Sequence, residues 1–77
     1  MTEFEKLKNS YISTIQMGLV SNAGYHEIKH GNDIIHKFCE QLVETSNYCD
    51  NVKTSMKREL ELLKETLLHE IDCCYKK

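Results

Sequence analysis

Histidine and cysteine are the side chains of this sequence that could bind a metal ion. Two pairs have helical spacing: His36 lies three residues before Cys39, and His69 lies four residues before Cys73. Residues three or four apart share one face of a helix, so each pair could supply two ligands. One His and one Cys from each pair would form a Cys₂His₂ set, which suits structural zinc. The spacing matches no zinc-finger pattern, so a metal-stabilised helical bundle is an alternative hypothesis here.

A third pair with helical spacing, His26 and His30, also falls on one helical face. Glu27 and His30 match the Glu-x-x-His pattern of di-iron bundles. Those bundles need a second copy of the pattern and two further glutamates on other helices. The sequence holds no second copy. We therefore interpret this segment as the solvated side of an amphipathic helix.

A catalytic set is not recognisable in this sequence. Cysteine, histidine and aspartate are all present, but their positions give no nucleophile, base and orienting group in a known arrangement. A glycine-rich phosphate loop is also missing. We expect a protein that is not an enzyme, with no catalytic residue and no cofactor.

The four cysteines bear on the cellular compartment. The first residues are acidic and carry no hydrophobic signal segment, so we expect a cytoplasmic protein with reduced thiols. Cys73 and Cys74 are adjacent, and neighbouring side chains on a helix point about 100° apart. At most one of the two can face a core, and we expect Cys74 to pack and Cys73 to be exposed.

Composition indicates the fold class. The chain has 77 residues, of which 40% are hydrophobic and 29% charged, and it contains no proline and only three glycines. Turns of a β-sheet draw on proline and glycine, and no segment alternates with a period of two. The sequence predicts a single all-α domain, either a small helical hairpin or a three-helix bundle, with one long C-terminal amphipathic helix.

The first helix is expected over residues 3–20. Thr2 and Glu5 form the pattern of an N-terminal capping box. Apolar residues then recur every three or four positions, at Phe4, Leu7, Tyr11, Ile15 and Leu19. The helix is expected to end at a reversal in residues 21–24, where Gly24 can adopt a positive φ.

Two further helices are expected over residues 25–46 and 51–75. The apolar face of the second comprises Ile28, Ile35, Phe38 and Leu42, flanked by Ile34, Cys39 and Val43. The third carries a stripe of nearly heptad spacing: Val52, Met56, Leu60, Leu63, Leu67, Ile71 and Cys74. Residues 45–51 have the composition of a loop, with Asp50 or Asn51 as a helix cap. However, the apolar phase continues through them, so one continuous helix from Tyr25 onward is the alternative.

The stripe of the last helix predicts an interaction surface. It is longer than the face that the first helix can offer, so we expect its apolar side chains to remain uncovered within one chain. The expected surface comprises Met56, Leu60, Leu63, Leu67, Leu68 and Ile71. A twofold dimer would cover it, so we expect dimerisation to complete the fold.

Charge and apolar pattern also bear on two other classes of partner, nucleic acids and membranes. The net charge of −2 argues against nucleic acid, whose partners carry a basic face. The broad apolar stripe of residues 31–77 resembles the helices of BAR-type membrane-curving bundles. That resemblance implies a membrane-surface helical bundle, although the acidic balance of the chain makes a membrane partner unexpected. The leading hypothesis is a non-catalytic protein–protein interaction module: a dimeric subunit, an adaptor or an inhibitor that docks on a larger protein.

Overall fold

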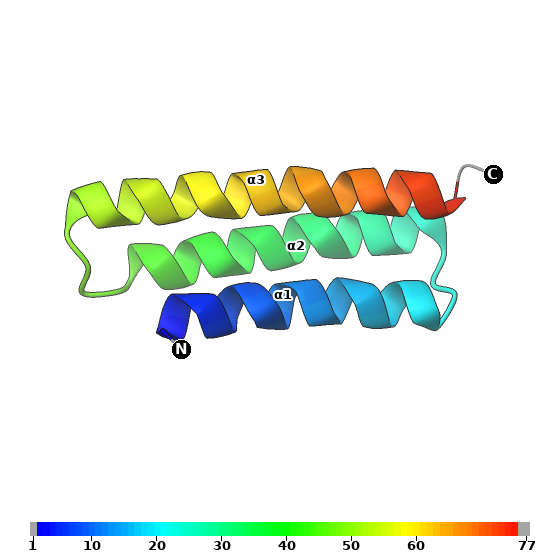
Figure 1. Cartoon of the computed structure of the whole chain (residues 1–77), viewed down its shortest axis with the longest axis horizontal. Coiled ribbons are helices and arrows are strands. Elements are labelled where there is room, and N and C mark those ends of the chain that lie inside the picture. The colour runs from blue at the N-terminus through cyan, green and yellow to red at the C-terminus, as the bar shows by residue number, and fades with distance from the viewer. Residues whose placement is uncertain (1, 76–77) are drawn as a thin grey trace.

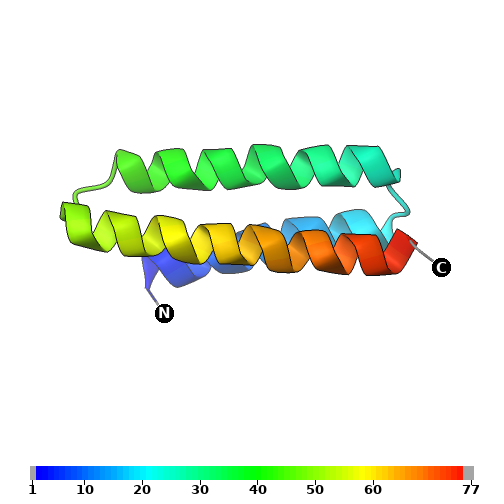
Figure 2. The same cartoon turned by 90° about the horizontal axis from the view of Figure 1, so that it is seen from above.

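A computed structural model describes residues 2–75 of the chain. In this part the fold is all-α, with helices α1 (Glu3–Val20), α2 (Tyr25–Glu44) and α3 (Asp50–Tyr75) and no strand. The helices run up, down and up in a bundle 43 Å long and 18 Å across (Figure 1). Figure 2, a view from above, shows that the three axes are not in one plane. The predicted all-α three-helix bundle is confirmed, and each helix boundary lies within two residues of expectation.

The start of α1 follows the sequence pattern. The backbone N–H of Glu5 donates a hydrogen bond to Thr2 Oγ1 at 3.1 Å, so Thr2 is the N-cap. Glu3 and Glu5 lie in the first turn, where a negative charge is favourable at the positive end of the helix dipole.

The end of α1 differs from expectation in which residue makes the turn. Asn22 adopts the left-handed conformation with φ of 58°, whereas Gly24 has φ of −62° and caps the start of α2. The N–H of Asn22 donates to the carbonyl of Leu19 at 3.4 Å, and the N–H of Ala23 donates to that of Gly18 at 3.1 Å. This is a Schellman motif, and asparagine tolerates its left-handed position better than most residues.

The segment 45–49 separates α2 from α3. Thr45 Oγ1 donates to the carbonyl of Gln41 at 3.1 Å, and Ser46 Oγ donates to that of Val43 at 2.5 Å. Such hydroxyl contacts compete with helix continuation. Helix α3 then begins at Asp50. The prediction of two separate helices is therefore confirmed, and the alternative of one continuous helix is wrong. The reversal between the helices lets α3 pack on α2.

All three helices contribute to the core. Its buried apolar residues are Tyr11, Ile15, Ile28, Cys39, Val43, Leu60, Leu67 and Ile71. Helix α2 also buries two polar residues, Asn32 and His36. The inward side of α2 is thus partly polar, which the apolar pattern of its sequence did not predict.

A buried hydrogen-bond network accounts for the polar position at Asn32. The Tyr11 hydroxyl donates to the carbonyl oxygen of Asn32 at 3.0 Å and also contacts its side-chain Oδ1. Asn32 Nδ2 donates to the carbonyl of Lys64 at 3.2 Å. One asparagine therefore connects all three helices, and burial raises the pKa of Tyr11 well above its usual range.

This network fixes the rotation of α2, and the rotation differs from the predicted one. Ile28 is buried as expected and Ile35 is partly buried, but Phe38 and Leu42 are exposed. Turning Phe38 inward would carry Asn32 out of reach of its two partners. A buried polar group must keep its hydrogen bonds, so the apolar face predicted for this helix is only partly in the core.

Ion pairs join the remaining side of α2 to α3. Asp33 lies 3.0 Å from Lys64 Nζ and 3.2 Å from Lys37 Nζ, and the hydrogen bonds of these lysines lower the pKa of its carboxyl. Near the other end of α2, the hydrogen bond from Lys57 lowers the pKa of Glu44. Exposed pairs contribute little energy each. They nevertheless place Asp33 and Glu44 of α2 beside lysines of α3.

Candidate interaction surface

The four metal-ligand candidates divide between the core and the surface. His36 and Cys39 are buried, whereas His69 and Cys73 are exposed on α3, with Cys73 Sγ 3.6 Å from His69 Nε2. Within residues 2–75, no three His, Cys, Asp or Glu side chains gather closely enough to hold a metal ion. The structure therefore brings His69 and Cys73 together but does not join them to the other pair.

The cysteines are free thiols in two environments. Cys39 is buried, and burial raises the pKa of its thiol, which makes it a poor nucleophile. Cys74 is exposed, as Cys73 is, so the expectation that Cys74 packs into the core is wrong. The core positions of α3 end at Ile71, one turn earlier.

The pair His26 and His30 lies at the start of α2, where both side chains are exposed. The His26 ring meets the Tyr25 ring edge-on, with centroids 5.4 Å apart. Their position agrees with the solvated side of a helix that the sequence indicates.

The predicted interaction surface on α3 is largely inside the bundle. Leu60, Leu67 and Ile71 are buried within the single chain, and Leu60 and Ile71 have no exposed area at all. The remaining three members, Met56, Leu63 and Leu68, are partly buried. The expectation that this stripe stays uncovered is wrong for the buried three, because both α1 and α2 pack on α3.

An exposed apolar surface exists instead on α2. Ile34, Phe38 and Leu42 are exposed by 52%, 60% and 43% of their areas. They are spaced four residues apart and therefore follow one side of the helix. At about 100° per residue, the positions between 31 and 45 that lie within about 60° of Phe38 are all uncharged, and Glu27, eleven residues before Phe38, is the charged residue in line with them. We call this set the α2 stripe: Gly31, Ile34, Ile35, Phe38, Gln41, Leu42 and Thr45.

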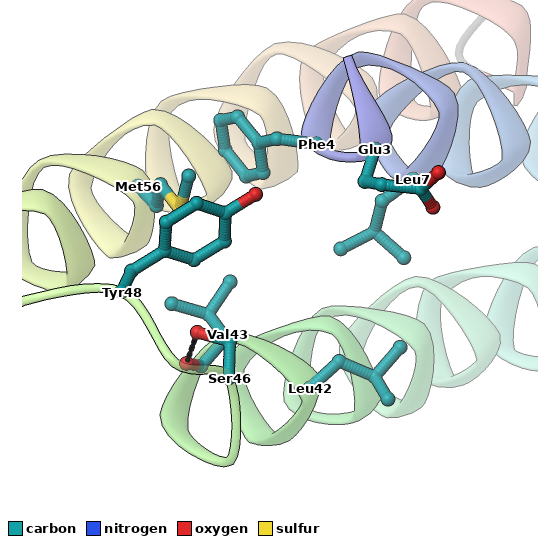
Figure 3. A pocket seen from close by; sticks show the side chains of 8 residues that line it. All are labelled: Glu3, Phe4, Leu7, Leu42, Val43, Ser46, Tyr48 and Met56. Atoms are coloured by element: carbon teal, nitrogen blue, oxygen red, sulfur yellow. Dashed lines mark hydrogen bonds between the residues drawn. The ribbon is translucent and has the colours of Figure 1, made fainter.

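Two hollows lie beside the α2 stripe, between α2 and the shorter α1. One, of about 210 Å³, is bounded by Phe4, Leu7, Leu42, Val43, Ser46, Tyr48, Met56 and Glu3. In Figure 3 the rings of Phe4 and Tyr48 and the side chain of Leu7 surround this space, at the end where α1 begins. The second hollow, also about 210 Å³, is lined by Leu7, Ser10, Tyr11, Thr14, Ile35, Phe38 and Cys39. Leu7 lines both, so an apolar groove runs along the α1–α2 side of the bundle.

A single exposed leucine on α3 provides the contrast. Leu62 is exposed by 59%, which nearly equals the exposure of Phe38. Its neighbours three and four residues away are Arg58, Glu59, Glu65 and Thr66. Isolated apolar residues among charges are normal on protein surfaces and indicate no site. The α2 stripe is different because its apolar residues are contiguous and no charge interrupts them.

The sequence contained a signal for this surface that hydrophobic periodicity alone missed. The apolar pattern predicts Ile34, Phe38 and Leu42 in the core or on its flank. Yet α2 presents three arcs: one buried, one charged, and one that carries no charge from Gly31 onward and exposes Ile34, Phe38 and Leu42. In a chain that is 29% charged, seven uncharged positions on an outer face indicate a surface that is not simply solvated.

Comparison with known proteins gives no relative for this chain. No protein-family model matches it, and neither the curated proteins nor the solved structures contain a significant match. None of the three described helices combines the length and the apolar character needed to cross a bilayer.

Proposed function

We propose that this protein is a non-catalytic helical interaction module that docks another polypeptide on the α2 stripe and the adjoining α1–α2 groove. The observation that carries the proposal is the uncharged stripe with Ile34, Phe38 and Leu42 exposed at its centre. Contiguous exposed apolar residues of this kind mark interaction surfaces on soluble domains.

The geometry favours an α-helix as the docked element. The stripe follows α2 for fifteen residues, about 21 Å at 1.5 Å per residue, and the groove beside it is lined by two roughly parallel helix axes (Figure 1). A fourth helix lying there would convert the three-helix bundle into a four-helix bundle. Its apolar side chains would enter the two hollows that Leu7 borders.

As part of the same proposal, we place the protein in the cytoplasm. Cys49, Cys73 and Cys74 are exposed free thiols. Such thiols persist in a reducing compartment and would pair or oxidise in a secretory one.

Site-specific photo-crosslinking tests the docking surface. A benzophenone amino acid placed at position 38 is compared with the same group at position 62, since the two native residues are equally exposed. We expect one predominant polypeptide adduct from position 38, identified by mass spectrometry. Ile34→Glu should abolish that adduct because it charges the same stripe, whereas Leu62→Glu should leave it unchanged.

Two results would overturn the proposal. Indistinguishable adduct patterns from positions 38 and 62 would show that the α2 stripe has no special role. Sedimentation with vesicles of phosphatidylcholine and phosphatidylserine, if abolished by Phe38→Glu, would assign the stripe to a membrane surface instead.

A further inference from the structure

We propose that the occupant of the α2 stripe is a second copy of this chain, bound antiparallel about a twofold axis at Phe38. This inference rests on the docking surface proposed above and names its partner. The geometric starting point is that Ile34 and Leu42 lie four residues on either side of Phe38.

A twofold axis at Phe38 makes the stripe complementary to itself. It places Phe38 against Phe38 of the second copy and Ile34 against Leu42 of the second copy. Such an axis pairs the position four residues before its centre with the position four residues after it on any helix. In this helix those paired positions hold large apolar residues, which therefore face one another at the centre of an isologous contact.

The flanking positions are also compatible with close approach. Gly31 falls opposite Thr45 of the second copy, so a small residue lies at each end of the contact. A Cβ atom added at Gly31 would meet nothing within 4 Å, so the space over it is open. No charged residue lies on the stripe between Gly31 and Thr45, and Glu27, which is in line with it, is about 16 Å from Phe38 along the helix, so two acidic chains can meet there without bringing like charges into the centre.

The size of the face suits a dimer. One long side of the bundle measures 43 Å by 18 Å, about 770 Å² in projection. Each partner of a standard stable interface buries about 800 Å². A short peptide would cover only part of this side, whereas a second bundle docked about Phe38 would cover more of it.

Sedimentation equilibrium across the micromolar range tests the dimer. We expect a mass of twice the chain at the upper end and dissociation on dilution. Phe38→Glu should raise the dissociation constant at least about 100-fold, since it removes two central aromatic contacts and places two carboxylates together. Leu62→Glu, at an equally exposed position, should leave it unchanged, and circular dichroism should show unchanged helix content in both variants.

The orientation is tested by a spin-label distance in the dimer. The exposed Cys49, Cys73 and Cys74 are replaced by serine, and a label is attached through His30→Cys. Position 30 lies eight residues from Phe38, so the antiparallel arrangement separates the two labelled backbones by roughly 25 Å. A parallel pair would bring them to about 8–10 Å, the usual distance between packed helix axes.

The outcomes separate this inference from the function on which it rests. A monomeric mass at all concentrations, with the position-38 adduct to a different polypeptide, overturns the dimer and supports docking. A dimer that tolerates Phe38→Glu shows that self-association uses another face and overturns the assignment of the α2 stripe. A dimer with labels about 10 Å apart overturns the antiparallel axis.

Discussion

The inward side of α2 is more polar, and one of its outward sides more apolar, than is usual in a small helical bundle. The inward side buries Asn32 and His36 beside Ile28, Cys39 and Val43, whereas the outward side exposes Ile34, Phe38 and Leu42. Hydrophobicity alone would favour the opposite rotation, since burying a phenylalanine stabilises a fold by roughly 1.5–3 kcal/mol. The observed rotation is selected because Asn32 bonds to α1 and α3 at the same time.

The two sides of α2 therefore have different roles: one sets the packing within the chain, and the other is available for an external contact. Its polar side specifies how the three helices of one chain pack, because only one rotation satisfies the asparagine. Its apolar side is then left for an external contact, and a domain of this size has little stability to forgo. Conversely, α3 shows no such division, since Leu60, Leu67 and Ile71 of its stripe are buried within the bundle.

The largest expected effect is a difference in the free energy of unfolding between two isoleucine-to-alanine substitutions on α2, one on its buried side and one on its exposed side. Ile28→Ala removes a buried side chain and should reduce the free energy of unfolding by about 2–5 kcal/mol. Ile34→Ala removes the same atoms from the exposed side and should cost less than about 0.5 kcal/mol in the monomer. Urea denaturation at the lowest protein concentration that gives a circular dichroism signal measures both.

Protein concentration then sharpens the same comparison. The cost of Ile34→Ala should grow as concentration rises, because assembly adds to the stability of whatever it binds. Equal losses from the two substitutions at low concentration would contradict the assignment of inner and outer sides.

A smaller effect should distinguish the two buried polar residues from each other. Within residues 2–75, His36 Nε2 is buried without a hydrogen-bond partner, while Nδ1 lies 3.4 Å from Glu40 Oε1. Replacing it by leucine removes an unsatisfied group, so His36→Leu should stabilise the fold by about 1 kcal/mol. Asn32→Leu should instead destabilise it by about 1–3 kcal/mol, since it leaves the Tyr11 network incomplete.

Urea denaturation of the two leucine variants provides the measurement. Opposite signs would show that specificity of packing resides in Asn32 alone. A loss of stability in His36→Leu would instead mean that the imidazole makes a favourable interaction in the folded bundle.

How far the sequence predicts this molecule depends on the kind of signal. Helix existence and boundaries follow from the cap at Thr2, the polar segment 45–49 and the repeated three and four spacing. The rotation of α2 does not follow, because Asn32 is an ordinary polar residue until Tyr11 and Lys64 are known to face it. The exposure of Leu60, Leu67 and Ile71 on α3 was predicted wrongly for a related reason.

The length of an apolar stripe shows how many side chains would gain stability from burial, but only the packing of the helices decides which of them are buried. Helix α1 is shorter than α3, yet α2 also packs along α3, and Leu60 is buried. A reading of charge as well as hydrophobicity along α2 would have identified the stripe around Phe38. It could not have shown which of the two apolar arcs is inside.

The smallest effect at neutral pH concerns the hydroxyl of Tyr11, and it should change with alkalinity. Tyr11→Phe removes the hydrogen bond to Asn32 and should cost about 1 kcal/mol near pH 7. The pKa of Tyr11 in the folded chain is raised above the ordinary 10.0, mainly by burial, so the unfolded chain ionises first. The stability that the neutral phenol provides is therefore complete below about pH 10 and is lost progressively as pH rises above it. The phenylalanine variant has no such loss, so the stability gap between the two proteins should narrow from about pH 10 upward.

Denaturation midpoints of the two proteins, measured from about pH 8 to about pH 12, would reveal this narrowing. A gap that stays constant over that range would show that Tyr11 ionises equally easily in both states, and hence that the polar side of α2 is not sealed from water.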